Sequence, residues 1–137
     1  MSLNSEFTLK KFDTDFVDDV DFSGTWINEL GSILILTCDA NQVIKGSYKT
    51  AKGAPSHKEV FSLVGFASGD LISFSVNFGK YGTLTSWVGQ HTLENDIEVI
   101  KTSWLLAKNI ADQDEEKDLW GAILTGANTF KRLEQDV

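Results

Sequence analysis

Cysteine, proline and basic residues are all scarce in this sequence. Cys38 is the single cysteine among 137 residues, so no disulfide can form within the chain and pairing indicates no redox compartment. Only 12 lysines and arginines face 20 aspartates and glutamates, which gives a net charge of −8. A chain this acidic lacks the positive surface that binding to a phosphate backbone requires, so we expect no nucleic-acid partner.

Long apolar runs are missing as well. The apolar run beside Cys38, from Ile33 to Leu36, is far too short to cross a bilayer, and we expect no membrane partner. The first residues, Met1 to Phe7, lack the basic and apolar regions of a secretory signal. The sequence therefore indicates a protein that stays inside the cell or one that begins after a removed leader.

Patterns typical of catalysis or metal binding are absent too. His57 and His91 lie far apart, and neither belongs to a cluster with metal-ligand spacing. The segment from Gly65 to Gly69 misses the G-x-S-x-G nucleophile elbow by one place and falls in a predicted hairpin turn. We expect a protein that is not an enzyme and that holds neither a metal nor a cofactor.

What is present is a regular series of predicted strands. With 42% apolar and 23% charged residues, a chain of this length is expected to form one globular domain. Turn signals separate eight segments with strand character, at the spacing of successive hairpins. The predicted strands cover residues 24–28, 32–38, 43–50, 59–66, 71–78, 85–92, 97–106 and 120–132.

Alternation within these strands predicts a closed barrel. It is clearest between residues 71 and 78, where Ile72, Phe74 and Val76 share one face. Closing eight strands covers such an apolar face, removes both sheet edges and leaves room for one small ligand. We predict an all-β fold, an eight-stranded antiparallel up-and-down β-barrel over residues 21–133. A flexible acidic leader is expected at residues 1–20 and a short tail at 134–137.

Polar and tryptophan positions recur in almost every predicted strand. They fall in the segments 22–32, 46–50, 83–90, 102–106 and 120–130. In order and nearly in spacing, these segments resemble the avidin and streptavidin family of biotin-binding proteins, from about Phe22 to Phe130. The resemblance implies that biotin is the bound ligand, sequestered with high affinity in the barrel interior without catalysis.

The resemblance also assigns polar contacts to individual residues. Asn28, Ser32 and Tyr48 match the three side chains that converge on the ureido oxygen of biotin, and all three can donate a hydrogen bond while neutral. Asn128 and Thr50 match the acceptors for the two ureido N–H groups. Two further matches are Thr85, for the thiophene sulfur, and Thr83, which with the backbone of Ala54 aligns with the positions that hold the carboxylate.

An apolar box around the ligand is implied as well, formed by Trp87, Trp104, Phe78 and Leu106. Phe78 stands where streptavidin has tryptophan, Asn128 stands where it has aspartate, and Lys52 occupies a loop position often held by a small or apolar residue. These departures affect the expected affinity more than the ligand's identity. Because Asn128 is neutral, binding is expected to be nearly constant from mildly acidic to neutral pH.

Trp120 carries the prediction of assembly. It precedes Asn128 by eight residues, the separation at which tetrameric family members carry a tryptophan that reaches a neighbouring subunit's pocket. The resemblance therefore implies a homotetramer in which Trp120 completes a neighbour's site; a tryptophan packed on its own barrel is the alternative. It also implies a secreted or periplasmic protein.

Two other functions remain compatible with the residues. A lipocalin-like carrier of another small hydrophobic ligand fits the barrel but does not explain the polar positions. An enzyme or enzyme inhibitor acting through the acidic segment from Asp112 to Asp118 would need a base or nucleophile, and none is nearby.

Overall fold

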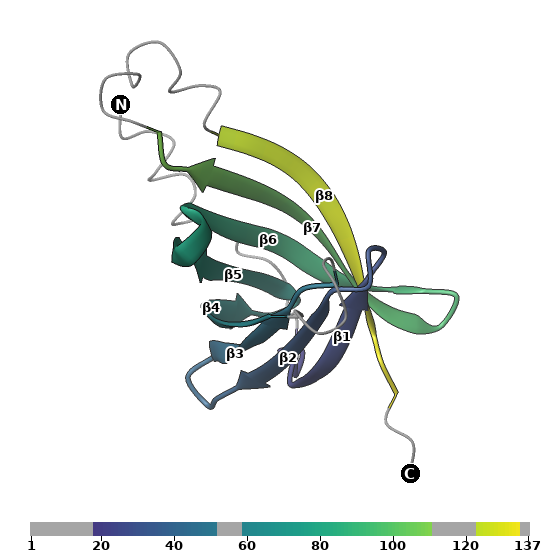
Figure 1. Cartoon of the computed structure of the whole chain (residues 1–137). Coiled ribbons are helices and arrows are strands. Elements are labelled where there is room, and N and C mark those ends of the chain that lie inside the picture. The colour runs from purple at the N-terminus through teal and green to yellow at the C-terminus, as the bar shows by residue number, and fades with distance from the viewer. Residues whose placement is uncertain (1–17, 52–58, 111–122, 135–137) are drawn as a thin grey trace, which may run out of the picture.

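The chain forms a closed β-barrel. The computed structural model describes residues 18–51, 59–110 and 123–134, which form eight strands and one short 3₁₀ helix. Each strand pairs antiparallel with the next, and the last returns to the first, as Figure 1 shows. The predicted eight-stranded antiparallel barrel is confirmed. The elements are β1 (Gly24–Asn28), β2 (Ile33–Cys38), β3 (Val43–Lys49), β4 (Val60–Ser68), β5 (Leu71–Phe78), η2 (Gly79–Tyr81), β6 (Thr83–Glu94), β7 (Ile97–Lys108) and β8 (Ile123–Arg132).

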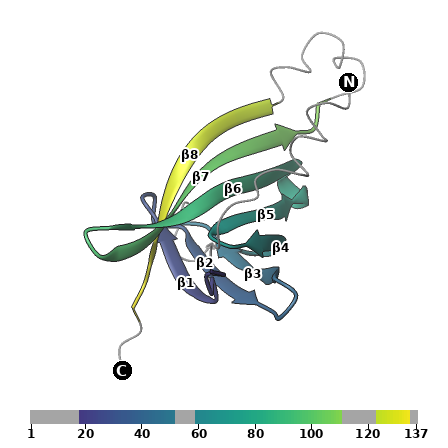
Figure 2. The same cartoon turned by 180° about the vertical axis from the view of Figure 1, so that it is seen from behind.

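Strands β6 and β7 are longer than the pattern predicted, at 12 residues each. Beyond the pairs Leu71↔Gln90 and Val99↔Lys131, no other strand of the described residues pairs with them. They continue as a two-stranded ribbon to Glu94↔Ile97. The ribbon projects from the barrel in both views (Figures 1 and 2). Asn95 and Asp96 close it with φ values of 52° and 65°, the left-handed geometry of a tight hairpin turn.

The barrel interior is filled by the inward positions of the strands. In β5, Ile72, Phe74 and Val76 are buried as their alternation predicted. Burying one such side chain contributes about 1.5–3 kcal/mol to folding, so these positions carry much of the stability. The largest fully buried side chains are Trp26, Phe22, Phe74, Phe130, Leu34, Leu36, Ile44, Leu63, Ile72 and Ile100.

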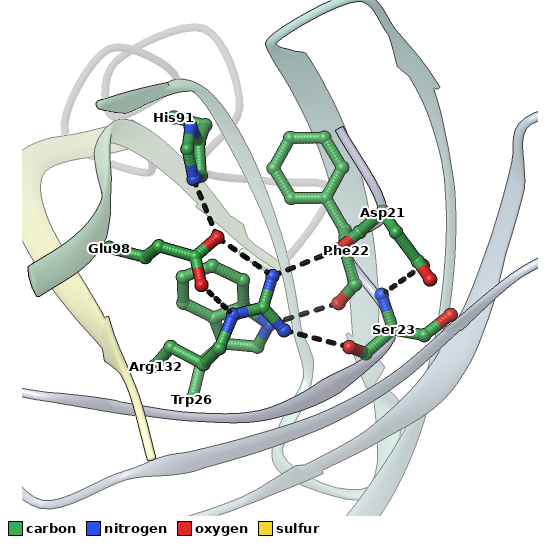
Figure 3. Close-up of polar contacts among 7 residues, drawn as sticks. All are labelled: Asp21, Phe22, Ser23, Trp26, His91, Glu98 and Arg132. Carbon is green, nitrogen blue, oxygen red and sulfur yellow. Dashed lines mark hydrogen bonds and ion pairs between the residues drawn. The ribbon is translucent and has the colours of Figure 1, made fainter. Parts of the chain in front are cut away.

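Arg132, at the end of β8, organises one end of the barrel, shown in Figure 3. Its Nε and Nη2 donate to the two Glu98 carboxylate oxygens over 2.7 and 3.2 Å. Its Nη1 and Nη2 also donate to the backbone oxygens of Ser23 and Asp21, each over 2.8 Å. The guanidinium lies over the Trp26 ring, 4.2 Å from its centroid, where cation–π attraction adds to the hydrogen bonds. The start of β1, the end of β8 and the β6–β7 ribbon are thereby tied together.

The same cluster extends through His91 and Glu98. His91 Nε2 lies 2.9 Å from Glu98 Oε1, and its ring meets those of Phe22 and Trp26 edge-on. Trp26 Nε1 donates to the Phe22 carbonyl over 3.0 Å. Burial acts to raise the pKa of Glu98, but the hydrogen bonds and charges of Arg132 and His91 outweigh it and lower that pKa below its ordinary value. We call this group of residues, Asp21, Phe22, Ser23, Trp26, His91, Glu98 and Arg132, the arginine clasp.

Contacts with the barrel begin before residue 21, the predicted boundary. The Val20 N–H donates to the Gly69 carbonyl over 2.9 Å, and the Gly69 N–H donates to Asp19 Oδ1 over 3.0 Å. Val20 also packs against the core. Most of the predicted leader, residues 1–17, and most of the predicted tail lie outside the described residues. No helix in the described ranges is long and apolar enough to span a membrane.

Candidate functional site

A cavity of about 440 Å³ opens at the end of the barrel opposite the arginine clasp. Antiparallel pairing places the end of β1, β3, β5 and β7 and the beginning of β6 and β8 around it. Its volume lies in the range of small-molecule sites. Nine residues predicted from the sequence line it together: Asn28, Tyr48, Thr50, Phe78, Thr85, Trp87, Trp104, Leu106 and Asn128.

Asn28 is the first polar group of this cavity. Its Oδ1 accepts the backbone N–H groups of Leu30 and Ser32 over 3.0 and 2.9 Å, which fixes both the β1–β2 turn and the side chain itself. Its Nδ2 is buried and has no hydrogen-bond partner among the described residues; the same holds for Thr85 Oγ1. Leaving a buried polar group unpaired costs about 1–3 kcal/mol, so the cavity is chemically suited to a guest with polar atoms.

Tyr48 and Ser32 lie beside Asn28. Both are buried, at 9% and 5% exposure, although Ser32 itself is not among the residues lining the cavity. Burial raises the pKa of Tyr48, and the polar side chains of Ser32 and Asn28 only partly oppose this shift. Its phenol therefore stays protonated at neutral pH and can act as a donor.

Asn128, on β8, is held from two sides. Its Oδ1 accepts from the Trp87 indole N–H over 2.9 Å, and its Nδ2 donates to Glu29 Oε1 over 2.7 Å. The Thr102 hydroxyl donates to the Asn128 backbone carbonyl over 2.9 Å, which secures the strand at this point. The amide is thus oriented before any ligand arrives.

Aromatic rings form the apolar wall. Trp87 stacks on Phe74 with centroids 5.1 Å apart and planes 15° apart, and Tyr48 lies 5.2 Å from the Trp87 ring. Trp104 pairs across β7–β8 with Gly126, and a Cβ there would collide with the indole. Glycine is therefore required at position 126 for the Trp104 ring to keep its place in the wall.

Besides Ser32, one described residue of the predicted site does not line the cavity, and two predicted site residues lie outside the described ranges. Thr83, at the first position of β6, lines a separate surface groove with Gly82 and Lys108, because the chain turns there just beyond the cavity rim. Ala54 and Trp120 lie outside the described residues, as does Lys52.

Sequence reasoning missed three lining residues, which are Glu29, Leu30 and Ala127. Glu29 stands directly after Asn28, and that adjacency was the one signal available for it. Its carboxylate accepts from Asn128 and from the Thr129 backbone N–H, 99 and 100 residues further along the chain. Such a pairing becomes visible only when the register of β1 and β8 is known.

Comparison with known proteins agrees with this fold. The Avidin family matches residues 16–133. The chain is 32% identical over 118 residues to avidin-related protein 4/5 of Gallus gallus, covering 81% of this chain and 77% of that protein. It is 29% identical over 113 residues to afifavidin of Afifella pfennigii, covering 79% and 67% respectively.

Solved structures give the same result. The barrel is similar to xenavidin, with 29% identity, a TM-score of 0.71 and coverage of 85% of this chain and 100% of that one. It is also similar to the protein in a rhizavidin–biotin complex, with 26% identity, a TM-score of 0.69 and coverage of 86% and 98%. The β-barrel fold is thus shared with these proteins, and the chain belongs to the avidin family.

Proposed function

We propose that this protein binds biotin in the barrel cavity and sequesters it with high affinity, without catalysing a reaction. The observation that carries the proposal is the Asn28 amide, a buried donor without a partner among the described residues, beside Tyr48 and Ser32. The polar side chains of Ser32 and Asn28 both interact with the Tyr48 phenol. Three neutral donors so close together suit a carbonyl oxygen such as that of a cyclic urea. Membership of the avidin family and the similarity to a rhizavidin–biotin complex support the choice of ligand.

The rest of the cavity is suited to the rest of the ligand. Asn128 Oδ1 and the Thr50 hydroxyl are acceptors for the two ureido N–H groups, and the Thr85 hydroxyl faces the ring sulfur. Trp87, Trp104, Phe78 and Leu106 then enclose the apolar ring system and chain. Thr83, the Ala54 backbone and a neighbour's Trp120 remain proposed contacts to the carboxylate end and the apolar box.

A lipocalin-like carrier of a purely hydrophobic guest is less well supported. Such a ligand would leave Asn28 Nδ2 and Thr85 Oγ1 buried without partners, at about 1–3 kcal/mol each. A ligand with one polar group at Asn28 and a further acceptor at Thr85 would give both atoms a partner.

The deciding experiment is a biotin titration followed by calorimetry and by tryptophan fluorescence. We expect one site per subunit and a quenched or shifted emission, because Trp87 and Trp104 line the cavity. Binding to the folded state alone raises stability by mass action, so excess biotin should raise the melting temperature by many degrees. Absence of both heat and thermal stabilisation would refute the proposal.

We also propose that the protein is a homotetramer, with Trp120 reaching a neighbouring subunit's site, and that it is secreted or periplasmic. The outer barrel face supports association, because several large apolar side chains are more than half exposed there, and burying such a patch against other copies is favourable. These side chains are Val64 at 58%, Phe66 at 65%, Val88 at 64% and Leu105 at 58%.

Light scattering and biotin release kinetics on Trp120→Lys test the assembly. The substitution is expected to lower the mass of the assembly and to speed biotin release together, because one residue serves both. An unchanged mass with an unchanged release rate would place Trp120 in its own barrel.

A further inference from the structure

Glu29 is a charged residue at the rim of the cavity with no role in the contacts proposed so far. It follows β1 directly, lines the cavity and is exposed on its outer side. Its Oε1 accepts from Asn128 Nδ2 over 2.7 Å and its Oε2 accepts from the Thr129 N–H over 2.9 Å. One carboxylate therefore ties the β1–β2 turn to β8 at the amide that faces the ligand.

The two neighbours of the Asn128 side chain fix its orientation. An ionised carboxylate can only accept hydrogen bonds, and an indole N–H can only donate. With Glu29 on one side and Trp87 on the other, the amide nitrogen must point to Glu29 and the oxygen to Trp87. Turning the amide over would set oxygen against carboxylate and N–H against N–H, which costs both hydrogen bonds.

This orientation decides what Asn128 offers to a ligand. The oxygen, with one lone pair used by Trp87, keeps a second lone pair for another donor. Hydrogen bonds in a chain polarise one another, so donation to the Glu29 carboxylate makes the amide oxygen a better acceptor. Without that carboxylate, only the Trp87 indole N–H would hold the amide in this orientation, and the amide nitrogen would lose its acceptor.

We propose that Glu29 is a positioning residue: its carboxylate holds the Asn128 amide so that the oxygen faces a ureido N–H of the ligand. This inference rests on the proposed function, because it assumes that Asn128 is an acceptor for biotin. Glu29, an exposed residue, thereby acquires a role in ligand selection beside the buried polar residues of the cavity.

The charge state of Glu29 is set locally. Burial acts to raise the pKa of its carboxyl, but hydrogen bonds from Asn128 and from the backbone N–H groups of Glu29 and Thr129 outweigh it and lower that pKa. No charged side chain in the described ranges contributes to the shift. Burial and, to a smaller extent, the Glu29 charge raise the pKa of Tyr48, so Tyr48 stays neutral. Glu29 is therefore ionised from neutral to mildly acidic pH, in agreement with the nearly constant binding expected there from the neutral Asn128.

The test compares biotin dissociation rates of Glu29→Ala, Glu29→Gln, Asn128→Ala and the double variant Glu29→Ala/Asn128→Ala. Because Glu29 is exposed, water replaces part of its role, and we expect Glu29→Ala to speed release by about tenfold, the loss of one hydrogen bond to a charged group. Glu29→Gln keeps one oxygen acceptor, so its biotin dissociation rate should lie between those of Glu29→Ala and the unsubstituted protein. The double variant should release biotin within about twofold of Asn128→Ala, because Glu29 acts through Asn128. Glu134→Gln, at an exposed position after β8, is the matched control.

A pH profile separates positioning from a structural role. The unsubstituted protein should release biotin faster once the pH falls through the lowered pKa of Glu29, below the ordinary glutamate value of about 4.3. Glu29→Gln has no such group and should show no such step, while the melting temperatures of the ligand-free proteins report folding separately.

Three outcomes decide between the proposals. If the unsubstituted protein does not bind biotin, the proposed function and this inference both fail. If it binds but the Glu29 variants release biotin at its rate, the inference alone fails. If the effects of Glu29→Ala and Asn128→Ala multiply in the double variant, Glu29 does not act through Asn128 and the inference is again overturned.

Discussion

The two ends of the barrel treat their polar groups in opposite ways. At the arginine clasp, Arg132 donates to a carboxylate and to two backbone carbonyls, and the Trp26 indole N–H has its own acceptor. At the cavity end, Asn28 Nδ2 and Thr85 Oγ1 are buried without a partner among the described residues. The same barrel interior thus satisfies polar atoms at one end and leaves two of them for a guest at the other.

The polar groups at one end of the barrel thus contribute to stability, and those at the other end contribute to ligand binding. Paired groups at the clasp lower the free energy of the folded state and join segments far apart in the chain. Unpaired groups at the cavity raise the free energy of the folded state. This cost is removed only when a ligand supplies the missing hydrogen-bond partners. Substitutions at the two ends should therefore affect the free protein in opposite directions.

The largest expected effect comes from breaking the clasp. Arg132→Ala removes four hydrogen bonds and a cation–π contact and leaves Glu98 partly buried without its main partner. We expect a loss on the order of 3 kcal/mol in the free energy of unfolding, measured by urea denaturation. Lys131→Ala, on the exposed side of the same strand, is the control and should change little. A loss at Arg132 no larger than the control's would mean that the clasp is not a stabilising element.

At the cavity, a substitution is expected to change the free energy of unfolding by a smaller amount and in the opposite direction. Thr85→Val removes a buried hydroxyl that has no partner among the described residues and keeps the side chain's shape. The ligand-free protein should gain about 1 kcal/mol of stability, while biotin affinity falls by about tenfold. Calorimetric melting of the free protein and a biotin titration measure the two changes. A variant that is both less stable and equally tight in binding would contradict the contrast between the ends.

The smallest effect concerns acid stability at the clasp. Because the pKa of Glu98 is lowered on folding, its contribution is fully present above its unfolded value of about 4.3 and is lost as pH falls through the folded value. Glu98→Gln should be less stable at pH 7 and should lose less stability between pH 5 and pH 3. The midpoints of urea denaturation between pH 3 and pH 7 measure this change in stability. Glu94→Gln, from the exposed pair with Lys101, should follow the unsubstituted profile, since such pairs contribute little.

Periodicity and resemblance predicted the barrel and most of its cavity. Alternation in β5 indicated which side chains face inward, because strand geometry places successive residues on opposite faces whatever their neighbours. Contacts that depend on register were not predictable. Glu29 meets Asn128 across 99 residues, and Glu98 reaches Arg132 from a ribbon that continues beyond the barrel. The local sequence pattern predicts where a strand lies and which of its side chains face inward. Contacts between distant residues depend instead on the register and length of the paired strands.

Because β1 pairs with β8, the strand order around the closed barrel does not depend on which strand comes first in the chain. Arg132 and Leu133 hydrogen-bond to Ser23 and Thr25, so the first and last strands are neighbours like any other pair. A linker across that point, with new ends opened between Asn95 and Asp96 at the tip of the projecting ribbon, would leave each strand between the same two partners. The cut would lie at the far end from the cavity loops, so a rewired chain of this kind should keep its ligand site while presenting both termini on one side of the molecule.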